Sequence, residues 1–390
     1  MKRRIALVLA VVLVGALAAL SAATALRPRA AAPVIGAPPK PAATLAYEPT
    51  AGASGVNPTA PISVHVASGT LADVTLRDPA GKAVEGKLAP DSTRWTASQP
   101  LSYGQTYTWS GTATGTNGDP VPLTGTFSTV TPKTQLRGVL NIGDGKTVGV
   151  AAPIEVQFNG HVENRAAVER ALSVTTSTPV EGAWGWLPDE NGGSRVHYRT
   201  KEYWPANTQV SVAAKLFGVD YGAGAFGRAD VSSSFTIGRA QIVKADANSH
   251  RLVVMRDGKK VADYPASYGL GSDPERNTRS GIHVVSEKFT DKRMVSERYD
   301  YDLVEKWAVR MSNNGEFIHA NPDTTGVQGS SNVTHGCVNL SLADAKAYYA
   351  TALYGDPVEV TGTPVKLAAR DGDIWDWTVS WDQWTGLSAL

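Results

Sequence analysis

Apolar and polar residues alternate in short runs along most of the chain, and turn signals separate the runs. Ile62–Val66 and Tyr107–Gly111 alternate in this way, and Asp78-Pro79 and Asn117–Pro120 are turn signals. Alternation with a period of two is typical of strands that bury one face. Several such strands at this spacing predict an all-β sandwich over residues 47–132.

The same pattern recurs over residues 133–238, which predicts a second sandwich. His65, His161 and His197 are scattered singly through the two stretches and are interpreted as surface or strand residues. Neither stretch contains a catalytic constellation, so we expect two tandem immunoglobulin-like sandwiches that act as spacers. The matching segments are Gly55–Ile62 with Gly149–Ile154, Val84–Gly86 with Val180–Gly182, and Phe127–Thr129 with Phe235–Ile237.

Residues 239–365 form a third stretch with a different pattern. Ala240–Lys244 and Arg251–Arg256 are typical of strands, and Asp257-Gly258 is a hairpin turn signal. Ser341–Tyr349 is typical of a short helix, with Ser341 as its N-cap. We therefore expect a mostly β domain that carries one short helix near its end.

Composition narrows the class of protein. The chain has 390 residues, which predicts two to four domains, and 37 Lys+Arg nearly balance 36 Asp+Glu. Because these charges nearly cancel, the chain has no strong positive electrostatic field that would indicate nucleic-acid binding. Hydrophobic residues make up 42% and charged residues 19%, which excludes disorder of the whole chain. A single cysteine excludes an intramolecular disulfide framework and a cysteine-rich metal site.

The first residues predict export. Met1–Arg4 is basic, and Ile5–Leu26 contains no charged residue and is long enough to span a bilayer. Ala23-Thr24-Ala25 is also an acceptable cleavage site, so residues 1–26 are a signal peptide or a membrane anchor, with a buried core helix as a third interpretation. The positive-inside rule places everything after Leu26 outside the cytoplasm. The Ala/Pro-rich residues 27–46 are interpreted as a linker.

The single cysteine carries the candidate chemistry. Cys337 lies in the segment Thr334–Asn339 (Thr-His-Gly-Cys-Val-Asn), and His319 precedes it at the end of a predicted strand. An unpaired thiol in an oxidising compartment is prone to unwanted oxidation and disulfide formation, so its presence indicates a function. A turn at Gly336 just before a helix would aim backbone N–H groups at the atom that the thiol attacks and would favour the thiolate, with His319 as its base. Three alternatives stay open: a small buried hydrophobic residue, a zinc ligand together with His319 and His335, and an inert degenerate site.

His319 and the segment Thr334–Asn339 together resemble the signature of the L,D-transpeptidases with a YkuD catalytic domain, namely His, a loop, then Ser/Thr-His-Gly-Cys-x-Asn. The two upstream sandwiches and the Trp-rich residues 366–390 resemble actinobacterial, mycobacterial-type members. The resemblance implies a mainly β fold, with two immunoglobulin-like sandwiches, a mostly β catalytic domain over 239–365 with a short helix after the nucleophile, and a C-terminal extension.

The resemblance also implies an activity and its partners. Cys337 would take an acyl group from a peptidoglycan stem tetrapeptide, with His319 as the general base and then as the acid for the leaving D-Ala. His335, Gly336 and the Cys337 amide would form the oxyanion hole. An acceptor stem would complete a 3→3 cross-link without a cofactor or metal, and carbapenems would acylate Cys337. The enzyme would lie on the outer face of the plasma membrane, held there by an uncleaved N-terminal segment, or be secreted into the cell wall.

Further positions follow from the same resemblance. Three departures from the family pattern are Ala320 in place of Ser, Asp323 in place of a large aromatic residue, and Thr278–Gly281, in which Arg279 stands where proline is usual. The positions that would contact substrate are Tyr301, Asn314, Gly315, Thr334 and Asn339, with Met294 and Tyr299 in a lid over the donor pocket.

Two alternatives to the transpeptidase remain. Water in place of the acceptor amine would make the protein an L,D-carboxypeptidase or endopeptidase, and a vestigial thiol would leave a cell-wall-binding protein. The tail would either stack on glycan or pack against the catalytic or second sandwich domain. Its tryptophans are Trp375, Trp377, Trp381 and Trp384.

Overall fold

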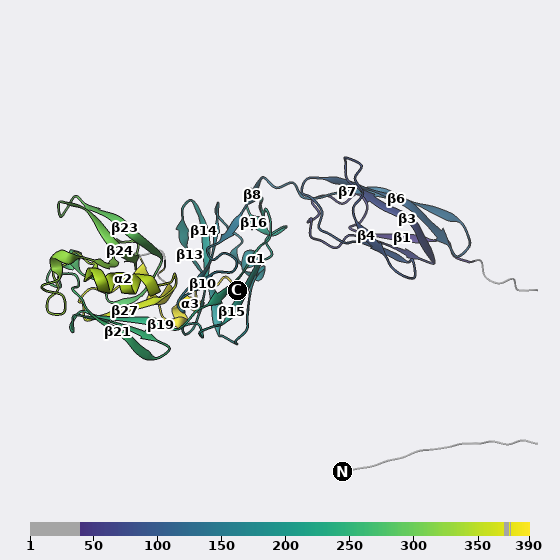
Figure 1. Ribbon diagram of the computed structural model, residues 1–390. Coiled ribbons are helices and arrows are strands. Elements are labelled where there is room, and N and C mark those ends of the chain that lie inside the picture. The colour runs from purple at the N-terminus through teal and green to yellow at the C-terminus, as the bar shows by residue number, and fades with distance from the viewer. Residues whose placement is uncertain (1–39, 370–373, 375) are drawn as a thin grey trace, which may run out of the picture.

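The computed structural model describes residues 40–369, 374 and 376–390. The predicted signal peptide or anchor (1–26), most of the linker (27–46) and Trp375 lie outside the described residues. Among the described residues, no helix is long and apolar enough to cross a membrane. Figure 1 shows three β-rich parts in a row, with residues 44–128 at one end and residues 241–361 at the other.

The first part is a sandwich of two antiparallel sheets whose facing aromatic side chains form its core. Trp95 and Trp109 meet edge to face with ring centroids 5.3 Å apart, and Tyr107 stacks on Phe127 at 5.7 Å. The sheets are β1 (Thr44–Glu48), β2 (Ser63–Ala67), β5 (Arg94–Ala97) and β4 (Gly86–Leu88), and β3 (Gly69–Arg77), β6 (Thr106–Gly115) and β7 (Pro120–Ser128), each in that order.

The second part contains two four-stranded sheets, a small three-stranded sheet and a short helix, α1 (Arg165–Arg170). The small sheet and α1 were not predicted. The four-stranded sheets are β10 (Thr147–Val148), β18 (Val231–Ile237), β15 (Gln209–Ala214) and β12 (Leu172–Thr176), and β13 (Gly182–Glu190), β14 (Gly193–Thr200), β11 (Ile154–Phe158) and β9 (Gly138–Leu140). The small sheet is β16 (Asp220–Gly222), β17 (Ala225–Gly227) and β8 (Thr134–Leu136).

The third part is built from two sheets and the predicted helix. Helix α2 (Leu342–Thr351) begins where Ser341 accepts a hydrogen bond from the backbone N–H of Asp344, as the N-cap prediction required. It contacts the second of the two sheets. The sheets are β21 (Lys259–Pro265), β20 (Arg251–Arg256), β19 (Gln241–Asp246), β27 (Pro357–Thr361) and β22 (Gly281–Val284), and β23 (Glu287–Ser296), β24 (Tyr301–Arg310), β25 (Phe317–Ala320) and β26 (Val338–Leu340).

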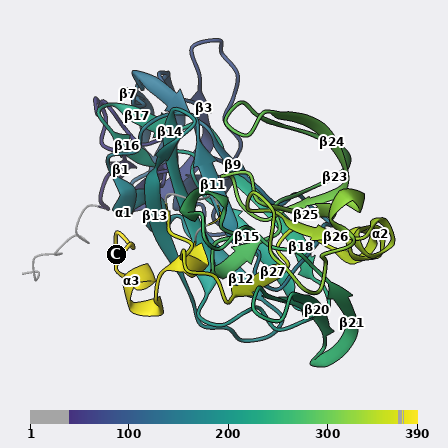
Figure 2. The ribbon, with the colours of Figure 1, turned by 90° about the vertical axis from the view of Figure 1, so that its left-hand side faces the viewer.

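The C-terminal residues run back onto the second part of the molecule. A 3₁₀ turn, η4 (Asp376–Thr378), contacts β22 of the third part and, through Asp376, His197 of β14, whereas α3 (Trp381–Thr385) contacts β13. Figures 1 and 2 show α3 beside the second part of the molecule. Trp384 is fully buried there, and its Nε1 donates to the Ala183 carbonyl 3.0 Å away. The described tail residues therefore pack on both of the domains considered: on the second sandwich through Trp384, and on the third part through η4 and through the Leu367 N–H, which donates to the Ser280 carbonyl at 2.8 Å.

Candidate active site

Two parallel neighbouring strands bring the predicted nucleophile and base together. His319 lies on β25, and Cys337 directly precedes β26, which pairs with β25 in parallel, with His319 opposite Asn339. Parallel partners align residues that are distant in sequence at the same edge of a sheet. The hairpin β23–β24 adds the next strand, β24, to the same sheet.

One part of the sequence argument about Cys337 is wrong. We expected a turn just before a helix, with the helix N-terminus favouring the thiolate. The structure inserts β26 and Ser341 between Cys337 and α2, so the helix begins only at Leu342. The effect of a helix dipole falls off within its first turn, and it therefore does not act on this thiol.

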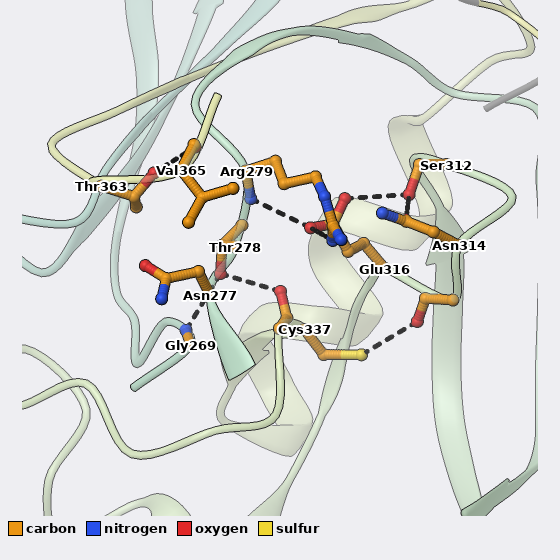
Figure 3. Close-up of polar contacts among 12 residues, drawn as sticks. Gly269, Asn277, Thr278, Arg279, Ser312, Asn314, Glu316, Cys337, Thr363 and Val365 are labelled. Carbon is orange, nitrogen blue, oxygen red and sulfur yellow. Dashed lines mark hydrogen bonds and ion pairs between the residues drawn. The ribbon is translucent and has the colours of Figure 1, made fainter. Parts of the chain in front are cut away.

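The turn before Cys337 depends on Gly336. Its φ is +120°, a conformation that L side chains rarely adopt, and a Cβ there would also lie 3.4 Å from the Asn277 carbonyl oxygen. The Gly336 carbonyl accepts a hydrogen bond from Thr278 Oγ1 at 2.8 Å (Figure 3), and the Cys337 carbonyl accepts one from Thr334 Oγ1 at 2.6 Å. These bonds fix the backbone on either side of the thiol.

A pocket of about 270 Å³ opens in front of the thiol. It brings together eight of the predicted residues, Met294, Tyr299, Tyr301, His319, Thr334, His335, Cys337 and Asn339. It is also lined by Leu303, Glu305, Asn321, Thr324 and Val333, which were not predicted. Cys337 is partly exposed on this pocket, so it does not fill a position in the core.

Gly315 and Asn314 lie beside the thiol rather than on the pocket wall. Cys337 Sγ lies 3.5 Å from the Gly315 carbonyl oxygen. Asn314 contacts Ser312, and Ser312 Oγ donates to Glu316 Oε2 at 2.9 Å (Figure 3). The structure therefore places the exposed Asn314 at the rim of a polar cluster around the buried Ser312 and Glu316, and its contact with substrate stays a prediction.

The same cluster explains why Arg279 replaces the usual proline. The backbone N–H of Arg279 donates to Glu316 Oε1 at 2.9 Å, and its guanidinium lies 3.3 Å from the same carboxylate (Figure 3). Proline has no N–H and would remove the first of these bonds. Glu316 is only 3% exposed, so a buried carboxylate would lose a partner.

His319 is held on one side by backbone and by a carboxylate. Its Nδ1 lies 2.8 Å from the Ala320 carbonyl oxygen and 3.4 Å from Glu305 Oε2. Ala320 stands where the family pattern has Ser, and its backbone carbonyl still contacts the His319 ring. Burial lowers the pKa of His319, but hydrogen bonds and charge from Cys337 and Glu305 outweigh burial and raise this pKa to about 10. Since Nδ1 faces Ala320 and Glu305, Nε2 is left for the thiol.

His335 and Tyr301 have pKa values shifted toward their neutral forms. Burial and the neighbouring Arg276 lower the pKa of His335, whose ring packs against that of Tyr299 in a tilted arrangement with ring centroids 4.4 Å apart. Burial and the negative charge of Cys337 raise the pKa of Tyr301. At neutral pH His335 is thus an uncharged wall of the pocket, and Tyr301 keeps its hydroxyl proton for donation.

Glu305 is the one carboxylate among the five pocket residues that sequence reasoning missed. In the pattern of β24 it is one of several charged residues of a half-exposed strand. One signal points to it, because Tyr301, Leu303 and Glu305 are two residues apart and therefore share a face of the strand. Among the described residues, no group of three or more His, Cys, Asp or Glu side chains forms a candidate metal site.

The fold and the site together define a pocket with a cysteine and a histidine at the edge of a β domain. Two β-sandwich domains precede this domain in the chain. The family pattern of the L,D-transpeptidase catalytic domain (YkuD) matches residues 240–360, and that of a bacterial Ig domain matches residues 53–220. L,D-transpeptidase 5 of Mycobacterium tuberculosis is 52% identical over 353 residues, which cover 90% of this chain and 78% of that protein.

Two further comparisons agree. L,D-transpeptidase 2 of M. tuberculosis is 36% identical over 348 residues, covering 87% of this chain and 83% of that one. A solved L,D-transpeptidase in complex with imipenem is 30% identical with a TM-score of 0.50, and the match covers 59% of this chain and all of that chain. The chain belongs to the L,D-transpeptidase family.

Proposed function

We propose that this chain is a peptidoglycan L,D-transpeptidase that forms 3→3 cross-links through a thioester on Cys337. The observation that supports this most directly is the partly exposed thiol beside the buried imidazole of His319, whose pKa is raised to about 10. A histidine that stays protonated at neutral pH favours a thiolate partner and holds a proton ready for a leaving group.

The first step is acylation. The Cys337 thiolate attacks the carbonyl carbon between the third and fourth residues of a stem tetrapeptide. The Cys337 backbone N–H and the Tyr301 hydroxyl stabilise the oxyanion of the tetrahedral intermediate. The C–N bond then breaks, His319 gives its proton to the departing D-Ala amine, and a thioester remains on Cys337.

The second step is transfer to an acceptor stem. The side-chain amine of the acceptor's third residue attacks the thioester carbonyl, and the now neutral His319 takes a proton from this amine. Collapse of the intermediate breaks the C–S bond, which forms the cross-link and restores the thiolate–imidazolium pair. No ATP is needed because the energy of the donor amide is conserved in the product.

Carbapenems should acylate the same thiol. The relative solved with imipenem supports this part of the proposal, and the pocket in front of Cys337 provides the access that a small acylating agent needs. We further propose that the enzyme works outside the cytoplasm, on the outer face of the plasma membrane or in the cell wall, because the Ile5–Leu26 segment is typical of export.

Mass spectrometry of the full-length protein with a purified disaccharide-tetrapeptide tests the activity. We expect a dimer lighter than two substrates by one D-Ala, which is absent with Cys337→Ala. A tripeptide product without dimer would instead establish the carboxypeptidase. No product from a folded wild-type protein would leave the wall-binding alternative and refute the proposed function.

A further inference from the structure

Glu305 is a carboxylate built into the wall of an otherwise largely aromatic and apolar pocket. It lies near the middle of β24, opposite Lys292 of β23 in the strand register. Its side chain is 14% exposed, and it lines the pocket together with Tyr301 and Leu303 of the same strand face. A carboxylate at such a place is desolvated, and it needs a partner to offset that desolvation.

The partner that the structure gives it is the imidazole of His319. Glu305 Oε2 lies 3.4 Å from His319 Nδ1, which also lies 2.8 Å from the Ala320 carbonyl oxygen. The Nδ1 proton is therefore shared between a neutral carbonyl and a carboxylate. The carbonyl orients the ring, but only the carboxylate interacts much more strongly with the charged imidazolium than with the neutral imidazole.

Other titratable groups face this pair from every side of the pocket. Those that line it are Tyr299 and Tyr301 from the hairpin β23–β24, and His335 and Cys337 from the segment before β26. The ammonium of Lys292 lies 4.4 Å from the ring of Phe289. Arg276 lies on the far side of Tyr299, where it lowers the pKa of His335.

We infer that Glu305 is a positioning residue of the acyl-transfer site, which holds the His319 ring and stabilises its imidazolium form while Cys337 acts as a thiolate. The inference rests on the proposed function and deepens it by adding a carboxylate to the cysteine and histidine. The raised pKa of His319 supports the argument, because the charge and hydrogen bond of Glu305 are among its causes.

This arrangement has a chemical consequence in each step. In acylation, Glu305 stabilises the imidazolium that must still carry a proton when the C–N bond of the donor breaks. In transfer, it favours uptake of the acceptor amine's proton by His319. Removing the negative charge of Glu305 should lower the pKa of His319. The imidazolium that acts as the acid would then lose its proton at a lower pH.

The test compares full-length wild type with Glu305→Gln and Glu305→Asp. Gln keeps the shape without the charge, and Asp keeps the charge on a shorter side chain. Glu287→Gln is the matched control, because Glu287 is a carboxylate of the neighbouring strand β23 that pairs with Arg310 and is absent from the pocket lining. Circular dichroism and thermal unfolding show whether each variant is folded.

Two readouts keep this inference separate from the proposed function. The first is the NMR titration of the His319 ring, assigned with His319→Gln, which needs no substrate. The second is the pH dependence of Cys337 acylation by the tetrapeptide, followed by intact mass. Because the chain has one cysteine, every thioester reports on this site.

We expect Glu305→Gln to lower the His319 pKa by about one unit or more and to shift the high-pH limb of acylation downward by the same amount. Glu305→Asp should restore at least half of the shift, and Glu287→Gln should match wild type. A folded Glu305→Gln in which His319 titrates as in wild type would overturn the inference. A wild type that is never acylated refutes the proposed function, while the titration still decides the role of Glu305.

Discussion

Gly336 controls the backbone on which the nucleophile sits, and no other residue type fits its conformation. Its φ is +120°, a backbone conformation that L side chains rarely adopt, so alanine would be strained there even though its Cβ would lie only in ordinary contact, 3.4 Å from the Asn277 carbonyl oxygen. Backbone strain of this kind costs about 1–3 kcal/mol. The turn relaxes that strain by shifting the Cys337 amide, so the loss should appear in reactivity more than in stability.

We therefore expect Gly336→Ala to slow acylation of Cys337 by a carbapenem roughly tenfold or more, since 1.4 kcal/mol corresponds to a factor of ten. Stopped-flow absorbance with intact-mass confirmation measures this rate. The control is Gly143→Ala, because Gly143 has open space where a Cβ would lie and belongs to the second sandwich. Equal rates for wild type and Gly336→Ala would show that the turn does not depend on glycine.

Thr278 links the turn to the loop that precedes β22. Its buried hydroxyl donates to the Gly336 carbonyl at 2.8 Å and accepts from the Gly269 N–H at 2.9 Å. Thr278→Val keeps the shape but leaves both backbone groups without this partner, which costs about 1–3 kcal/mol. We expect this loss in urea unfolding monitored by tryptophan fluorescence, with most of the stability retained in Thr278→Ser. A Thr278→Val variant as stable as wild type would contradict this role.

Sequence reasoning found the reacting residues but not the residues that support them. Gly336 and Cys337 share a short motif, and His319 lies eighteen residues earlier at the end of a predicted strand, so the motif and its resemblance to a known family are enough to find all three. Glu305 acts only through the pairing of β24 with β25, which a single sequence does not reveal. The prediction that a helix N-terminus favours the thiolate is wrong for a local reason: the short strand β26 lies between the thiol and α2, and the sequence pattern did not reveal it.

Among the elements, the hairpin β23–β24 forms one wall of the pocket. Its strands supply Met294, Tyr301 and Leu303 to the pocket, and the turn between them supplies Tyr299. Arg298 in that turn forms an ion pair with Glu275 of η1 (Pro274–Arg276). The pair is exposed, so we expect it to contribute little to stability. The tip also contacts the segment before Cys337 through the tilted ring pair of Tyr299 and His335.

Substitutions of Tyr299 test the contact between its ring and that of His335. Its ring lies 4.4 Å from that of His335, and an aromatic pair of this kind contributes about 0.5–1.5 kcal/mol beyond its buried area. We expect Tyr299→Ala to raise the KM for the donor tetrapeptide roughly three- to tenfold with a small change in kcat. Tyr299→Phe keeps the ring and should behave as wild type, because the Tyr299 hydroxyl has no hydrogen-bond partner in the described part of the chain. If Phe and Ala variants lose activity equally, the hydroxyl and not the ring is the important group.

Strand β14 shows why the outer face of the second sandwich could not be predicted. Its sequence alternates polar and apolar residues, which predicts one exposed face, yet every residue from Gly193 to Thr200 is buried. The C-terminal residues cover the polar face, and the Arg199 guanidinium lies 4.7 Å from the ring of Trp377 and 5.2 Å from that of Trp384. Only the tertiary fold brings residues almost 180 positions apart together.

Over the whole molecule, the second sandwich is joined to the catalytic domain more extensively than to the first sandwich. The Gly149 N–H donates to the Tyr354 carbonyl at 2.7 Å, and the Tyr203 hydroxyl donates to Glu359 Oε1 at 3.1 Å. The tail adds a second link, because it leaves the catalytic domain and ends on the second sandwich (Figure 1). Toward the first sandwich, Tyr103 donates to the Gly227 carbonyl and Asn57 to the Gly218 carbonyl.

A buried ion pair fastens this tail. His197 was interpreted as a surface or strand residue; it does lie on β14, but it is fully buried, with Nδ1 3.0 Å from Asp376 Oδ1. Burial lowers the pKa of His197, but the charge and hydrogen bond of Asp376 outweigh burial and raise it above its usual value. Removing one partner of a buried pair leaves the other uncompensated and is strongly destabilising.

The pH dependence of this pair has a definite sign. A histidine whose pKa is higher in the folded than in the unfolded state binds its proton more tightly when folded. Its contribution to stability is therefore fully present below about pH 6.5, the unfolded value, and is lost as the pH rises through the folded pKa. Asp376→Asn removes the carboxylate that raises this pKa, so the free-energy difference between wild type and variant should be largest at low pH. It should shrink with a slope of at most about 1.4 kcal/mol per pH unit.

Urea unfolding of wild type and Asp376→Asn at intervals from pH 5 to 9 measures this difference, and subtraction cancels the titration of all groups that the two proteins share. Asp382→Asn is the matched control, because Asp382 is an exposed carboxylate of the same tail. A difference that stays constant over the whole range would mean that the charge state of His197 in the folded protein does not depend on Asp376, which would contradict the predicted coupling of the pair. A difference that falls with rising pH would instead make the tail a link between catalytic domain and second sandwich that is strongest in acidic surroundings.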